Sequence, residues 1–187
     1  MTYEIQQASP SDDPRIEALL DRTFGYDRKQ RTSYRLREGI APLASLCFVA
    51  RHADGGLLAS IRYWPIRIER SPAILLGPLA VEPALQGQGY GKALVRHSLS
   101  EAKRQGHALC VVIGAPGYYE PFGFVSAPAA GLVMPGPVAP ERFQVLALRA
   151  GALAGLHGVV GRAESAESDG LSAEGADLES DRAPRRA

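Results

Sequence analysis

The stretch Leu76–Val95 reads LGPLAVEPALQGQGYGKALV and combines an apolar strand, a glycine-rich loop and the start of a helix. Gly87, Gly89 and Gly91 fall within five positions, so the backbone can turn sharply and approach a ligand without Cβ atoms in the way. A helix predicted over about 90–105 follows directly, and the first amides of a helix have no partner within it. This order predicts an anion site suited to phosphate or pyrophosphate.

Two common phosphate-binding motifs do not fit this loop. A P-loop needs a glycine five positions before Gly91 and a hydroxyl after Lys92, but Gln86 and Ala93 stand there. A dinucleotide fingerprint that starts at Gly87 fails because Lys92 occupies its last glycine position. A nucleotide-binding protein is therefore disfavoured, and a flexible connection that binds nothing stays open as an alternative.

A third pattern, Gln/Arg-x-x-Gly-x-Gly/Ala, is filled by Gln86, Gly89 and Gly91, and here the sequence resembles the GNAT superfamily of acyl-CoA-dependent N-acetyltransferases. The segment GAPGYYEPFGF, residues 114–124, is similar to the family's Tyr-x-x-x-Gly-Phe segment. The order of strands and helices matches over about 2–149, and residues 76–132 with GALAGLHG at 151–158 resemble the YhbS-like branch of predicted acetyltransferases. The resemblance implies a GNAT-like acyl-CoA N-acyltransferase fold with a splayed central sheet.

The same resemblance implies an acetyl-CoA site and no metal. Backbone groups of the strand would pair with the pantetheine arm, and amides of the loop would hold the pyrophosphate. The expected cofactor-binding residues are Leu79, Ala80, Val81, Gln86, Gly87, Gln88, Gly89, Tyr90, Gly91 and Lys92. Lys92 and Arg96 would lie near the cofactor phosphates or be ordinary charges on the helix surface.

Tyr119 stands four residues before Gly123, in the family's tyrosine position. The resemblance implies that its phenol protonates the departing thiolate. The alternative for Tyr119 is core packing with a satisfied hydroxyl, as buried tyrosines commonly show. Tyr118 is expected to pack beside it.

Gly77-Pro78 interrupts the apolar strand. Proline removes a ladder donor, so a bulge or a splay is expected there. In the resembled family this strand diverges from its neighbour, so the resemblance implies a gap where the acyl-CoA enters. Our hypothesis is that the irregular backbone near Leu79 offers an N–H to the thioester carbonyl.

The general base is not assigned. The stretch Leu75–Pro78, which matches the family's usual place for a basic carboxylate or histidine, has no titratable side chain. Glu38, Glu69, Glu82 and Glu120 are candidates, and a water-mediated base or a neutral incoming amine are the alternatives.

Three functions follow from these motifs. The first is an acyltransferase that moves acetyl from acetyl-CoA to a primary amine, of a small molecule or a peptide, by direct attack in a ternary complex. The second is a non-catalytic acyl-CoA-binding module, and the third is the disfavoured nucleotide-binding protein. A homodimer is possible, and the sequence does not determine the oligomeric state.

The remaining segments predict an α/β domain with a mixed sheet (α+β). The expected helices are an amphipathic one from Pro14 to Phe24 and an Arg-rich one over 27–39. The basic residues of 28–37 either favour an acidic substrate or form a solvated face, and the second interpretation is the simpler. The expected strands are 3–8, 46–50, 57–68 with a bend at Trp64-Pro65, 73–81, 108–113 and, last, 142–149.

Charge separates a body from a tail, although the net charge of the 187 residues is only +1. Residues 1–162 hold 18 basic and 13 acidic side chains, and residues 163–187 hold 3 and 7. The body is too weakly basic for a nucleic-acid surface but suits a small polyanionic ligand. We expect a GNAT-like domain over 1–160 and a disordered acidic tail over 161–187.

Other classes of protein are also disfavoured. No apolar run is long enough for a membrane span, and the first ten residues lack the features of a signal peptide, so we expect a cytoplasmic protein. Cys47 and Cys110 lie in apolar runs and are expected to be buried free thiols. The four histidines show no metal-ligand spacing, so no metal is expected.

Overall fold

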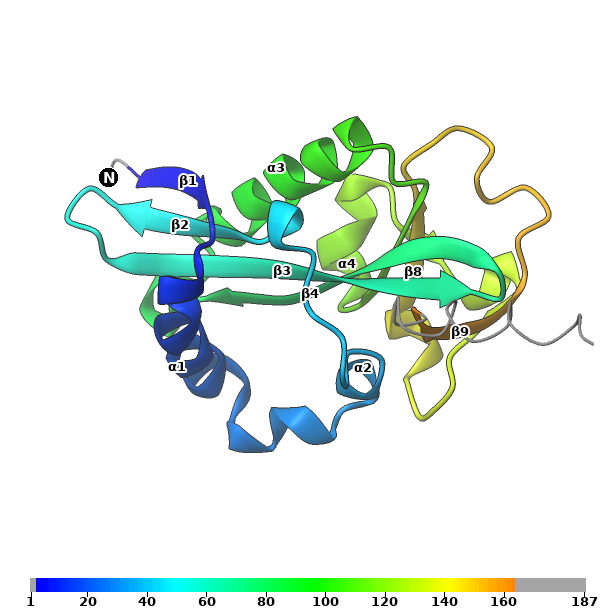
Figure 1. Ribbon diagram of the computed structural model, residues 1–187, viewed down its shortest axis with the longest axis horizontal. Helices are drawn as coiled ribbons and strands as arrows, with labels where there is room; N and C mark the ends of the chain where they lie inside the picture. The colour runs from blue at the N-terminus through cyan, green and yellow to red at the C-terminus, as the bar shows by residue number, and fades with distance from the viewer. Residues whose placement is uncertain (1–2, 164–187) are drawn as a thin grey trace, which may run out of the picture.

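The computed structural model describes residues 3–163, whose strands form one mixed sheet (Figure 1). The order of the main path is β1-β2-β3-β4-β5-β8-β6, and β9 pairs with both β3 and the short β7. Neighbouring strands are antiparallel except for β4 with β5 and β7 with β9, which are parallel. The strands are β1 Tyr3–Gln7, β2 Phe48–His52, β3 Leu57–Ile68, β4 Ser71–Val81, β5 Leu109–Ile113, β6 Val125–Ser126, β7 Leu132–Val133, β8 Phe143–Ala147 and β9 Gly158–Arg162. This architecture confirms the expected α/β domain with a mixed sheet.

Helices cover both faces of the sheet. α1 (Asp13–Phe24) and the short α2 (Thr32–Arg35) lie on one side, and α3 (Tyr90–Arg104) and α4 (Pro116–Tyr119) lie on the other (Figure 1). The two sides follow from the alternation of side chains along a strand. Within β4, Ile74 and Leu76 join the apolar cluster beneath α3, whereas Leu75 joins the cluster on the opposite face. Burial of both faces explains why this strand is apolar almost throughout.

The ladder between β4 and β5 is short. Only Ile74–Leu76 of β4 pair with β5, opposite Cys110–Val112, and β4 continues for five more residues to Val81. On its other side β4 stays paired with β3 as far as Val81, although the register shifts where β4 carries the extra residue of Gly77-Pro78. The sheet therefore splays open at the position that the proline predicted.

Several elements differ from expectation. The expected helix over 27–39 is broken into a 3-10 helix, Tyr26–Gln30, and the four-residue α2, because this polar stretch has too few apolar residues for one continuous amphipathic helix. β3 is one continuous strand, and its register against β4 shifts between Ile61 and Tyr63.

The C-terminal part of the fold extends beyond the last strand that the sequence predicts. β9 follows β8 and pairs Arg162 with Ile66 of β3, so the sheet includes two residues that the expected boundary at 160 assigned to the tail. This strand is short and glycine-rich, and long-range pairing rather than a local pattern defines it. Residues 164–187, which hold nearly all of the expected tail, lie outside the described residues.

Cys47 and Cys110 are buried free thiols, as predicted. Within residues 3–163, no helix is long and apolar enough to cross a bilayer.

Candidate functional site

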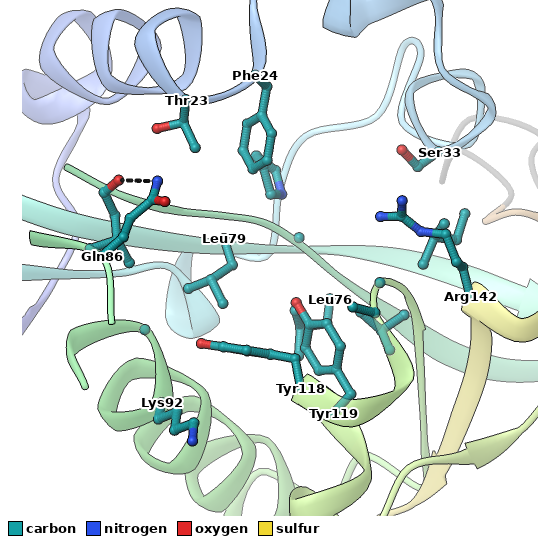
Figure 2. Close-up of a pocket in the computed structure, with 18 of the residues that line it drawn as sticks. Thr23, Phe24, Ser33, Leu76, Leu79, Gln86, Lys92, Tyr118, Tyr119 and Arg142 are labelled. Carbon is teal, nitrogen blue, oxygen red and sulfur yellow. Dashed lines mark hydrogen bonds between the residues drawn. The ribbon is translucent and has the colours of Figure 1, made fainter. Parts of the chain in front are cut away.

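A cavity of about 860 Å³ occupies the opening between β4 and β5 (Figure 2). Its walls come from the splayed end of β4, the loop before α3, the end of β5 with α4, and the ends of α1 and α2. Segments far apart in the sequence, such as Thr23 and Tyr118, thereby face the same space. A cavity of this size suits a small-molecule ligand.

The glycine loop forms one wall of this cavity. Every residue from Gln86 to Lys92 lines it, as the sequence predicted for a ligand-facing loop. Gly87 and Gly89 have φ angles of +81° and +94°, which residues with a Cβ rarely adopt. Gly89 caps α3, so the unpaired amides of the first helical turn lie at the cavity wall. This wall presents N–H groups and the positive end of a helix dipole to an anion.

Gly91 is required for a different reason. A Cβ at this position would lie 2.5 Å from Tyr118 Oη and 3.2 Å from Val81 Cγ2. The absence of that atom lets α3 approach both β4 and the helix that carries Tyr118. In this loop, Gly87 and Gly89 set the backbone conformation, and Gly91 permits close packing.

The free edge of β4 forms a second wall. Glu82 N donates to Leu58 O at 2.9 Å, so residues 82 and 80 direct their backbone groups toward β3. In an antiparallel ladder the intervening residues point the other way, so Leu79 and Val81 direct N–H and C=O toward the opening. Gln86 Nε2 donates to Val81 O at 3.4 Å, which is consistent with this direction.

Ala80 differs from its two neighbours. It does not line the cavity; it is fully buried with Ile16, Leu19 and Leu20 of α1. Its side chain and its backbone groups both point away from the opening because strand residues alternate. The expected role of Ala80 in cofactor binding stays a prediction that this orientation does not support.

Two tyrosines of α4 form the third wall. The Tyr119 ring points from α4 toward the splayed end of β4, and Tyr118 reaches toward the start of α3 (Figure 2). The rings meet edge to face, with their centroids 4.9 Å apart. Burial raises the pKa of the Tyr119 phenol above its usual value, so the group stays protonated at neutral pH. A protonated phenol that faces a cavity can donate a proton.

Most of the charged residues that the sequence analysis named as candidates lie outside the cavity wall. Lys92 lines the cavity, whereas Arg96 does not and stacks over the Phe122 ring, 5.6 Å from its centroid. None of the four candidate glutamates lines the cavity either, and Glu82 pairs with Arg22 at 2.5 Å. In the described part of the chain, the cavity wall carries no carboxylate and no histidine.

Many lining residues were not among the expected site residues, and three of them, Gly114, Arg37 and Arg142, bear on the chemistry. Gly114 lies directly behind the Tyr119 ring, and its position after an apolar strand was a signal that could have indicated close packing. Arg37 belongs to the basic stretch whose simpler interpretation was a solvated face. Arg142, the residue before β8, had no local signal. Within residues 3–163, no group of acidic, histidine or cysteine side chains is arranged to hold a metal ion.

A sheet that opens beside one strand, a glycine loop at a helix N-terminus and a buried phenol together define an acyl-CoA-type transferase fold. Residues 44–126 match the family model described as acetyltransferase (GNAT) domain. The chain is 33% identical over 158 residues to the uncharacterized N-acetyltransferase YhbS of Escherichia coli (strain K12), with 83% of this chain and 93% of that protein covered. The chain therefore belongs to the GNAT acetyltransferase family.

Solved structures agree with this assignment. A structure of Escherichia coli YhbS in complex with CoA matches with a TM-score of 0.75 at 31% identity, covering 86% of this chain and 89% of that one. A GNAT-family acetyltransferase of Brucella melitensis in complex with acetyl-CoA matches with a TM-score of 0.59 at 27% identity, covering 78% and 88%. The GNAT-like fold that the motifs implied is confirmed.

Substitution of Gly114 tests how the Tyr119 ring is positioned. A Cβ at this residue would overlap that ring, so we expect Gly114→Ala to lower the free energy of unfolding by about 1–3 kcal/mol, the usual cost of overpacking. Gly117→Ala is the matched control, since a Cβ there meets nothing within 4 Å. Urea unfolding of both variants measures the difference, and equal stabilities would show that the ring is not held against Gly114.

Proposed function

We propose that the protein transfers an acetyl group from acetyl-CoA to a primary amine of a small molecule or peptide. The observation that carries the proposal is that one cavity joins the glycine loop, the unpaired edge of β4 and the Tyr119 phenol. The complexes of YhbS with CoA and of the Brucella protein with acetyl-CoA support the choice of cosubstrate.

The residues around the opening fit acetyl-CoA in three ways. Amides between Gly87 and Lys92 bind the pyrophosphate at the N-terminus of α3, where the helix dipole favours an anion. Leu79 and Val81 offer backbone groups that pair with the amides of the pantetheine arm as an added strand would. The gap beyond Leu76 leaves room for that arm between β4 and β5.

The reaction proceeds by direct attack within a ternary complex. The amine nitrogen forms a bond to the thioester carbonyl carbon, and the carbonyl oxygen gains negative charge that the Leu79 N–H stabilises. The carbon–sulfur bond then breaks, and Tyr119 donates its proton to the leaving thiolate. The attacking nitrogen loses a proton to water, and the phenolate takes one back, so the products are the N-acetyl compound and CoA with a free thiol.

The amine enters in its neutral form under this proposal. The described part of the cavity wall has no carboxylate or histidine within it to remove a proton from an ammonium group. Basic side chains on the same wall, including Arg37 and Arg142, disfavour a second cation and thereby favour the neutral amine.

Binding and turnover measured together test the function. We expect calorimetry to show that acetyl-CoA binds far more tightly than ATP or NAD, because only acetyl-CoA uses both the loop and the edge of β4. Release of free thiol in the presence of an amine panel then reports transfer. Binding without turnover of any amine would instead favour a non-catalytic acyl-CoA-binding module.

Tyr119→Phe tests the proton donor. We expect kcat to fall by about 100-fold, a typical contribution of general acid catalysis, with little change in affinity for acetyl-CoA. Tyr118→Phe serves as the comparison because the Tyr118 hydroxyl lies beside Gly91 of the loop, whereas the Tyr119 ring points toward the splayed end of β4 (Figure 2). An unchanged kcat in Tyr119→Phe would remove this residue from the mechanism.

Gly89→Glu tests the anion-binding loop. The new carboxylate repels the pyrophosphate, so we expect the Kd for acetyl-CoA to rise at least about tenfold, equivalent to ~1.4 kcal/mol. Gly106→Glu is a matched control because its φ of +86° is as strained for a side chain as the +94° of Gly89, yet it lies at the other end of α3. Titration calorimetry compares the two, and equal weakening would show that backbone strain alone is responsible.

A further inference from the structure

Basic side chains surround the half of the cavity that faces α1 and α2. Arg28 and Arg31 line it from the segment between these helices, Arg37 lines it from the segment that follows α2, and Arg142 lines it from just before β8. Arg28 is already neutralised, since it pairs with Glu17 and Asp21 behind the wall. Arg37 and Arg142 form no ion pair with any residue between 3 and 163.

Arg37 is held firmly in this wall. Its guanidinium stacks between two aromatic rings, 4.6 Å from the centroid of Tyr34 and 4.8 Å from that of Trp64. Nη2 lies 3.6 Å from the position that a Cβ at Gly77 would occupy, which places it beside the bulge of β4. The stacking fixes the plane of the guanidinium, so its N–H groups keep a constant direction toward a bound group.

Two of the three guanidinium nitrogens nevertheless lack a hydrogen-bond partner among the described residues. Nε and Nη1 are buried and have no hydrogen-bond partner among the described residues, and the same holds for the Tyr34 hydroxyl beside them. Burial lowers the pKa of Arg37 to about 10, so the side chain stays cationic at neutral pH. A buried, unpaired cation is costly unless a bound group supplies the missing charge and acceptors.

Arg142 adds a second cation to the same space. Its guanidinium extends from the residue before β8 into the cavity, toward Ser33 on the opposite wall (Figure 2). Arg142 also flanks the tyrosine wall, because its carbonyl accepts a 2.9 Å hydrogen bond from Gly114 N. An anion near Arg37 and Arg142 would therefore lie close to the phenol of Tyr119.

We propose that Arg37 and Arg142 bind an anionic group, a carboxylate or a phosphate, carried by the amine acceptor. This inference rests on the proposed function and specifies its substrate class. Gly77, beside Arg37, precedes Leu79 by two residues, and two residues span at most about 7 Å. The acidic group must then lie only a few bonds from the reacting amine, as it does in an amino acid or a short aminoalkyl phosphate.

Matched acceptors test the charge requirement. Thiol release is compared for amino acids and their carboxamides, and for aminoalkyl phosphates and the corresponding amino alcohols. We expect kcat/KM to be at least about tenfold higher for the acidic member of one pair, the magnitude of a desolvated charged contact. The pair that shows the difference identifies the anion, and equal values in both pairs would overturn the proposal.

Variants of the two arginines show where that preference arises. We expect Arg37→Gln and Arg142→Gln each to reduce the preference for the acidic acceptor while the Kd for acetyl-CoA stays unchanged. Arg70→Gln removes the same charge from an exposed turn outside the cavity and should preserve the preference. A weaker Kd for acetyl-CoA in Arg37→Gln would mean that this residue serves the cofactor, which would also overturn the proposal.

A binding measurement separates this proposal from the proposed reaction. Calorimetry follows the acidic ligand and its neutral partner as they bind to the CoA-saturated protein, with no turnover required. Tighter binding of the acid, lost in Arg142→Gln, supports the anion site even if no amine is acetylated. Equal binding of acid and neutral partner contradicts it even if acetylation occurs. Arg142 is exposed, so its variant is informative even if Arg37→Gln fails to fold.

Discussion

The hydrogen-bond ladder between β4 and β5 joins only three residues of each strand, and beyond Leu76 β4 continues with one edge unpaired. An unpaired strand edge inside a protein leaves polar backbone groups without partners, a situation that folded proteins avoid unless a ligand or water completes the ladder. The extra residue at Gly77-Pro78 turns the strand away from β5 while β3 holds its other edge. The cavity, the free groups of Leu79 and Val81 and the access to Tyr119 all depend on this opening.

The same opening connects the two faces of the sheet. α3 and α4 approach it from one side, and the ends of α1 and α2 approach it from the other (Figure 1). A cosubstrate bound along the loop and an acceptor that enters past Phe24 and Tyr34 would therefore meet within the sheet and not on its surface. This arrangement supports the proposed direct transfer between two bound molecules.

Two different kinds of positive potential serve the two proposed ligands. At the loop the potential comes from helix amides, with Lys92 as a side chain at the same wall. On the acceptor side it comes from the guanidinium groups of Arg37 and Arg142. The net charge of +1 reflects neither, because amides carry no formal charge and acidic residues elsewhere balance the arginines.

The sequence alone determined the features that arise locally. The strand, loop and helix of 76–95, the break at Gly77-Pro78 and the tyrosine of α4 were all predictable, because glycine, proline and apolar periodicity act on their nearest neighbours. Only the tertiary structure decided that Ala80 turns away from the cavity, that Gly114 makes room for Tyr119, and that Arg37 and Arg142 face one space. The orientation of Ala80 depends on strand register, the fit of Gly114 to Tyr119 depends on how α4 packs, and Arg37 and Arg142 come from segments more than a hundred residues apart. A local pattern does not encode these relations.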